Sequence, residues 1–148
     1  MKPRKFFLAL VALLMPLMAS AQYTIYPVPH SQTAGTSGTV AFTPTVNIVC
    51  DAGIDDYTRQ RALTVFTEHG FAATVSNTES ASLSNVYLGV ASANGKAKAA
   101  ANSLSLDLSV LTRSGKFDRH LLSLTNAGKG VAQLIIIGEN TDATFMGF

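Results

Sequence analysis

Two adjacent carboxylates, Asp55 and Asp56, are the residues of this sequence best suited to acid and base chemistry. A neighbouring pair of carboxyl groups can divide the roles of proton donor and polarising anion. On a helix, successive side chains diverge by about 100°. Acidic residues at a helix start also favour its dipole and cap its free amides. Because a helical pattern begins here, we expect the pair to open a helix and not to catalyse a reaction.

The histidines and the single cysteine offer no ligand set that the sequence can identify. His30, His69 and His120 are far apart, and none has a second ligand at a spacing such as His-x-x-x-His. His69 falls in the last turn of a predicted helix, where a cation is favoured. Cys50 has no partner for an internal disulfide, so we expect a small buried residue at the end of a strand over 46–50.

The glycines around residue 90 have only a superficial likeness to a phosphate-binding loop. Five residues separate Gly89 from Gly95, where the loop needs four, and Ala97 replaces the Ser or Thr that would hold magnesium. No serine lies in a Gly-x-Ser-x-Gly elbow. The sequence therefore predicts no catalytic, cofactor-binding or metal-binding residue.

Exposed tyrosines are the remaining candidates for ligand binding. Tyr23, Tyr26 and Tyr57 have the chemistry of a sugar-stacking platform, because an aromatic face can pack on a pyranose ring. One-sided packing of such rings against the protein is the commoner arrangement, so sugar binding by this domain is the weaker interpretation.

The N-terminus has the order of a secretory signal peptide. Three basic residues among the first five precede an apolar run over 6–18 and the small residues Ala19-Ser20-Ala21. At 1.5 Å per residue, this run of about 13 residues is too short for a bilayer core of roughly 30 Å. We expect cleavage after Ala21, a secreted or periplasmic product and no membrane anchor.

Cleavage would also change the charge of the chain. It removes three of the 11 Lys and Arg residues and none of the nine Asp and Glu residues, which leaves eight positive charges against nine negative ones. The mature net charge is then near −1, and the basic character of the whole sequence belongs to the targeting segment. No basic patch indicates a nucleic-acid partner.

Strand and helix patterns alternate along residues 22–148, which are enough for one domain. Residues 22–38 are predicted to be extended, because Pro27 and Pro29 forbid a helix. We predict strands over 39–50 (split by Pro44), 71–76, 85–90, 120–125 and 131–137, helices over 56–69 and 96–103, mostly loop over 107–118 and a hairpin turn over 126–130. The run from Leu134 to Ile137 is apolar on both faces, so the last strand should lie inside the sheet with cover on each side.

The end of the chain predicts the opening of one more helix. Thr141 or Asp142 is suited to be its N-cap, and residues 143–148 have the pattern of a first turn and a half. A helix this short is marginal in water and lacks a C-cap. We therefore expect the chain to be a fragment or a truncated reading frame.

Three stretches together resemble a known family. They are residues 26–30 (Tyr-Pro-Val-Pro-His), the strand-to-helix passage over 46–56, and residues 137–148 (IGENTDATFMGF), the most specific of the three. They are similar to the N-terminal domain that precedes the catalytic barrel in glycoside hydrolase family 84, the secreted hyaluronidase-like and O-GlcNAcase-like β-N-acetylglucosaminidases. Related front domains occur in family 20 β-hexosaminidases and in some α-glucuronidases.

The resemblance implies an α/β (α+β) fold, a small mixed β-sheet with helices packed on one face, which lies against a (β/α)8 barrel. In that family the barrel bears two adjacent aspartates that assist attack by the substrate's own 2-acetamido group. Asp55 and Asp56 are not that pair, because they open a helix whereas the catalytic pair ends a barrel strand. No catalytic residue is carried over to this chain.

The chain is thus expected to be the non-catalytic front domain of a secreted β-N-acetylglucosaminidase, truncated at the start of its last helix. Its partners would be its own missing catalytic barrel and, through the parent enzyme, N-acetylglucosamine-containing glycans. The alternative is a free-standing secreted module that binds glycans or has a structural role.

Overall fold

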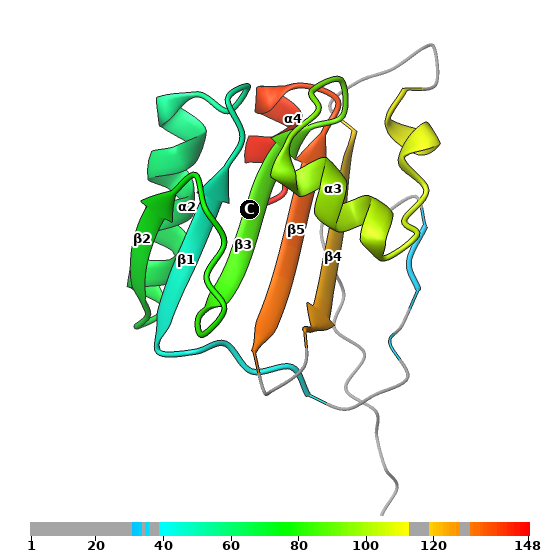
Figure 1. Ribbon diagram of the computed structural model, residues 1–148. Coiled ribbons are helices and arrows are strands. Elements are labelled where there is room, and N and C mark those ends of the chain that lie inside the picture. The colour runs from blue at the N-terminus through cyan, green and yellow to red at the C-terminus, as the bar shows by residue number, and fades with distance from the viewer. Residues whose placement is uncertain (1–30, 34, 36–38, 113–118, 128–130) are drawn as a thin grey trace, which may run out of the picture. The chain divides into compact units, whose positions relative to one another are not determined.

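The computed structural model describes residues 31–33, 35, 39–112, 119–127 and 131–148. The chain divides into two compact units, Met1–Ser37 and Gly38–Phe148, and the helices and strands described below belong to the second (Figure 1). The predicted signal peptide and most of the predicted extended segment lie outside the described residues. Within the described ranges, no helix has the length and apolar character needed to cross a membrane.

Five strands in the described part of the chain form one mixed sheet in the order β2-β1-β3-β5-β4 (Figure 1). The strands are β1 (Thr45–Cys50), β2 (Ala72–Ser76), β3 (Ser84–Val90), β4 (His120–Asn126) and β5 (Ala132–Gly138). β1 is parallel to β2 and β3, and β3 is parallel to β5, whereas β4 runs antiparallel to β5. The predicted α/β class with a small mixed sheet is confirmed.

The sequence predicts a strand on each side of Pro44, but only the second of them, β1, forms. The segment before Pro44 is held by side chains: the Ser84 N–H donates to Thr43 Oγ1 (2.8 Å), and the Thr43 N–H donates to Ser84 Oγ (2.9 Å). Phe42 packs edge to face against Phe66 at a centroid distance of 5.6 Å. These contacts take the place of a strand ladder, from which a proline also removes a donor.

Helices cover both faces of the sheet, which corrects the prediction of helices on one face only. α2 (Asp56–Glu68) and α4 (Thr141–Phe145) lie on one face, and α3 (Lys96–Ser103) lies on the other (Figure 1). The physical reason lies in β5, where Ile136 joins the core under α2 while Ile135 and Ile137 join the core under α3. A strand that is apolar on both faces needs cover on both, as its own sequence predicts.

Each long helix buries a stripe of its own side chains. α2 packs Ala62 and Phe66, one turn apart, and α3 packs Ala97 and Ala101 with the same spacing. α2 ends before Gly70, whose φ of 84° lies in the left-handed region that glycine adopts most easily. A short 3-10 helix, η1 (Leu108–Leu111), forms in the segment predicted to be mostly loop, and residues 113–118 of that segment lie outside the described ranges.

Asn140 is the N-cap of α4, so the prediction of Thr141 or Asp142 as the cap is wrong by one or two residues. The Asn140 side chain accepts from the Ala143 N–H (2.7 Å), and its backbone is extended at φ −146° and ψ 178°. Thr141 already belongs to the helix, where its backbone cannot take the extended conformation that a cap requires.

Thr144 holds α4 against the centre of the sheet. Its fully buried Oγ1 donates to the Gly89 carbonyl of β3 (2.8 Å) and accepts from the Gly138 N–H at the end of β5 (3.0 Å). A Cβ at Gly138 would collide with the α4 backbone, and one at Gly147 would collide with Ile136. The glycines and Thr144 of the C-terminal motif therefore let one short helix lie directly on two strands.

Replacing Thr144 with valine should lower the free energy of unfolding by about 1–3 kcal/mol, because two buried backbone groups would lose their shared partner. Thr144→Ser keeps the hydroxyl and should lose much less. Urea unfolding of both variants measures the difference, and an equal loss in the two would show that the hydroxyl does not hold α4.

Candidate functional site

The carboxyl ends of β1 and β3 form the edge where an open α/β sheet ordinarily binds its ligand. The chain leaves β1 through α2 on one face of the sheet and leaves β3 through α3 on the other, so this is the topological switch point. Asp51 follows β1 directly and is buried there, with 7% of its surface exposed.

The Asp51 carboxylate occupies the N-terminus of α3. It accepts from the Lys96 N–H (2.7 Å) and from the Ala97 N–H (3.2 Å). A helix N-terminus at the switch point is where a phosphate or a carboxylate of a ligand would bind. In this domain a carboxylate of the chain itself takes that position.

Gly89 and Gly95 serve the same internal carboxylate. A Cβ added at either position would run into the Asp51 side chain, and one at Gly89 would also meet the methyl group of Ala97. The two glycines that bear a superficial likeness to a phosphate-binding loop therefore surround an aspartate of the protein. Asp51 was not singled out from the sequence, where it looks like an ordinary turn residue.

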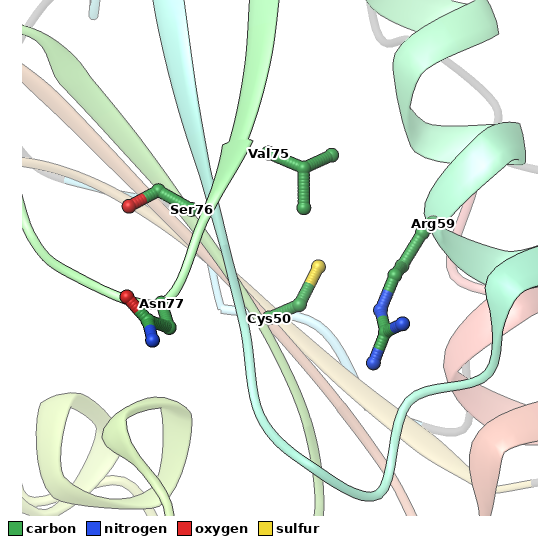
Figure 2. Close-up of a pocket in the computed structure, with 5 residues that line it drawn as sticks. All are labelled: Cys50, Arg59, Val75, Ser76 and Asn77. Atoms are coloured by element: carbon green, nitrogen blue, oxygen red, sulfur yellow. The ribbon is translucent and has the colours of Figure 1, made fainter.

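A shallow groove of about 480 Å³ lies beside this edge, at the ends of β1 and β2 next to α2. It is lined by Cys50, Arg59, Val75, Ser76 and Asn77. Figure 2 shows the side chains of Ser76 and Asn77 pointing away from those of Cys50 and Arg59. The polar groups of this groove do not converge on one point, as the groups of a catalytic site must.

Cys50 ends β1, as predicted, but it is half-buried and not fully enclosed. Burial raises the pKa of its thiol, and the nearby Arg59 guanidinium opposes this shift only in part. Arg59 is also engaged by Asp56, at 2.7 Å. A reactive cysteine needs a lowered pKa or an adjacent base, so this thiol is not activated for nucleophilic attack.

The two adjacent aspartates open α2, as predicted. Asp55 is the N-cap, and its side chain accepts from the Thr58 N–H (2.7 Å). This backbone hydrogen bond lowers the pKa of Asp55. Asp56 lies one residue further on, exposed, in its ion pair with Arg59.

The histidines do not come together in the residues that the structure describes. His69 caps the end of α2 with its Nδ1 2.8 Å from the Val65 carbonyl oxygen, and His120 is exposed at the start of β4. His30 lies outside the described residues. Within those ranges no three His, Cys, Asp or Glu side chains are grouped so that they could hold a metal ion.

Of the three tyrosines considered for sugar stacking, only Tyr57 lies among the described residues. Its side chain is 72% exposed and stacks on Phe145, with ring centroids 5.0 Å apart and an interplanar angle of 20°. Gln60 and Arg61 line the small hollow beside the two rings. The partner ring comes from the C-terminal motif, which sequence reasoning did not connect with Tyr57.

Comparison with known proteins connects this fold to a glycosidase. No known protein-family profile and no curated protein matches the sequence. A solved structure titled "Structure of CpGH84D" is similar to 86% of this chain, with a TM-score of 0.73 and 25% sequence identity. The chain has a family 84-like fold. It spans 20% of the length of the chain in that structure.

Asp51→Ala should lower the free energy of unfolding by about 1–3 kcal/mol, because α3 loses its cap and its first amides lose their acceptor. The variant also leaves the helix N-terminus open to an anion, so added sulfate should stabilise it more than the parent chain. Asp56→Ala, which removes an exposed carboxylate, is the matched control for general salt effects. Equal stabilisation of both variants by sulfate would contradict the interpretation that Asp51 occupies an anion-binding position at the N-terminus of α3.

The rate at which iodoacetamide alkylates Cys50 should reach half its maximum at a higher pH than for an ordinary cysteine, because burial disfavours the thiolate. Arg59→Gln removes the opposing positive charge and should move that midpoint further upward. Mass spectrometry over a pH series measures both midpoints, with the urea-unfolded chain as reference. A downward shift in Arg59→Gln would show that Arg59 does not stabilise the thiolate.

Proposed function

We propose that this chain is the exported, non-catalytic N-terminal domain of a β-N-acetylglucosaminidase-type glycoside hydrolase that acts on N-acetylglucosamine-containing glycans. The observation that carries the proposal is the match of 86% of this chain to one fifth of a much longer family 84 chain. A domain that fills one fifth of such a chain leaves most of the chain for a separate catalytic unit, here the proposed (β/α)8 barrel.

The described residues support a non-catalytic role. Asp51 fills the switch point of the sheet. Burial raises the pKa of the Cys50 thiol, and the polar side chains of its groove do not point toward it. Asp55 and Asp56 are used to cap and pair within α2. The chemistry of the proposed enzyme would therefore come from residues outside this domain.

The N-terminal sequence supports export. The basic, apolar and small-residue order of residues 1–21 is that of a cleavable signal peptide. Export would bring the enzyme to extracellular or periplasmic glycans, where a β-N-acetylglucosaminidase finds its substrate.

Reading the coding DNA beyond codon 148 tests the proposal. It should encode, in one of the frames, a barrel with two adjacent aspartates after a strand. The proposal fails if no frame encodes such a barrel.

The 148-residue chain itself should release no nitrophenol from 4-nitrophenyl N-acetyl-β-D-glucosaminide above the blank rate. The reason is that the carboxylates of Asp51 and Asp55 cap helices and that of Asp56 pairs with Arg59. A colorimetric assay of the purified chain measures the release of nitrophenol. The double variant Asp55→Asn/Asp56→Asn is the control for trace activity. Turnover that disappears in the double variant would refute the non-catalytic role.

A glycan-binding module is the second candidate, favoured by the exposed ring of Tyr57 beside Gln60 and Arg61. Such a module would be retained on an N-acetylglucosamine polymer, and Tyr57→Ala would abolish retention while Tyr57→Phe would preserve it. The front-domain proposal predicts that the chain passes through the same column unretained.

A further inference from the structure

β4 is an outer strand of the sheet, and among the described strands it pairs with β5 alone (Figure 1). In an antiparallel pair, the residues whose backbone groups bond to the neighbouring strand alternate with residues whose groups point away from it. The Ala127 N–H donates to the Val131 carbonyl (2.8 Å), so the odd-numbered residues are the ones bonded to β5. The N–H and C=O groups of Leu122 and Leu124 therefore point to the open side of β4.

The side chains of the same two leucines extend the core of the domain into solvent. Leu122 is 54% exposed and Leu124 is 44% exposed. In the β4–β5 register they lie opposite Ile136 and Leu134, which belong to the core on the α2 side of the sheet. The apolar row on this side thus ends in two leucines on the outermost strand.

β4 lacks the features by which natural sheets protect an edge strand. Such strands are usually very short, or they carry charged residues, a proline or a bulge. β4 has seven residues, HLLSLTN, with no Lys, Arg, Asp, Glu or Pro, and its register with β5 is unbroken. An edge of this kind is a template on which another strand can pair.

We infer that the partner is the β4 strand of a second copy of this chain, related to the first by a two-fold axis through Ser123, so that two five-stranded sheets join into one. Antiparallel pairing centred on Ser123 overlaps all seven residues and sets Leu122 opposite Leu124 of the second copy. Each such pair exchanges both of its backbone N–H···O bonds, because the groups of both residues point outward. A two-fold interface must pair one surface with itself, and β4 is self-complementary in this register.

The pairing also joins the two cores on the α2 side of the sheet. Directly opposite residues of an antiparallel pair lie on the same face and contact each other. The apolar row across the seam would run through Ile136 and Leu122 of one copy and then Leu124 and Leu134 of the other. The exposed leucines of each copy thus cover those of its partner.

The pairing brings no charges of the same sign together within the strands. β4 has no Asp, Glu, Lys or Arg, and its one histidine, His120, would lie opposite Asn126 of the second copy and not opposite its own equivalent. A strand of another protein would need the same leucine spacing and the same absence of charge, whereas β4 itself has both. The inference uses only β4 and β5, so it goes beyond the proposed function and does not rest on it.

Sedimentation of the purified chain over a concentration series should show a monomer–dimer equilibrium. Leu122→Lys/Leu124→Lys sets lysine opposite lysine in both pairs and should raise the dissociation constant by about tenfold or more. Leu122→Lys/Leu124→Glu changes the same two positions but sets each lysine opposite a glutamate, so it should retain the dimer. Val75→Lys, at an exposed residue of the other edge strand β2, is the control and should leave the equilibrium unchanged.

A cysteine at the centre of β4 tests the register directly. Ser123 would face its own equivalent as a non-hydrogen-bonded pair with a Cα–Cα distance of about 4.5 Å, which lies within the range of a disulfide. In the Cys50→Ser background, Ser123→Cys should form a disulfide-linked dimer with dissolved oxygen as the oxidant, visible on a non-reducing gel. Thr125→Cys, on the same face, would lie about 13 Å along the strand from its equivalent and should remain a monomer on the gel.

The inference is overturned if the parent chain sediments as a monomer throughout the series, or if its dimer survives the double-lysine change, because β4 would then not form the contact. It is also overturned if the variant with one lysine and one glutamate dissociates as fully as the double-lysine variant, or if Thr125→Cys cross-links as readily as Ser123→Cys, because the register would then differ. A monomer would leave the proposed function untouched, and a gene that encodes no barrel would leave the dimer standing.

Discussion

The carboxylate of Asp51 holds together the edge of the sheet at which the parallel strands β1 and β3 end. It joins the end of the first strand to the start of α3, 45 residues later, through two backbone N–H groups. The contact requires glycine at positions 89 and 95, because a side chain there would displace the carboxylate. α3 lies on the face opposite α2, so the central strands are buried on both sides. The cap of α3 and the filling of the switch point thus depend on one side chain.

Local signals in the sequence were sufficient to predict most of the helices and strands. The Ala-rich pattern defines α3 with its observed bounds, and the apolar run in β5 correctly indicates a central strand covered on both sides. The prediction of helices on one face failed because it was taken from the family resemblance, while the strand itself indicated two-sided cover. The predicted cap was wrong by one or two residues because three neighbouring residues, at 140–142, can all act as caps.

Sequence patterns could not predict the contacts that form the candidate site. Asp51 meets the start of α3, and Tyr57 meets Phe145, across long stretches of chain. Periodicity reports which face of an element is apolar, but it does not report which distant side chain will fill a helix N-terminus or cover a ring. The expectation that Asp55 and Asp56 cap a helix succeeded because that chemistry is local.

The most distinctive residues of the C-terminal motif contribute to packing. In the C-terminal motif, Thr144 bonds to two strands and Gly147 lets the chain approach Ile136. These features attach a short helix firmly to the sheet. Holding a larger catalytic unit would be the task of this domain in the proposed enzyme, while Asp51 fills its own switch point.

The most direct test of this account is a titration of the 15N-labelled chain with phosphate and then with N-acetylglucosamine, followed at the backbone amides of Lys96 and Ala97. Both amides already donate to Asp51, so the account predicts that their chemical shifts do not change with either ligand. A saturable shift of these two amides would show that the carboxyl edge accepts a ligand and would contradict the closed site on which the structural role rests.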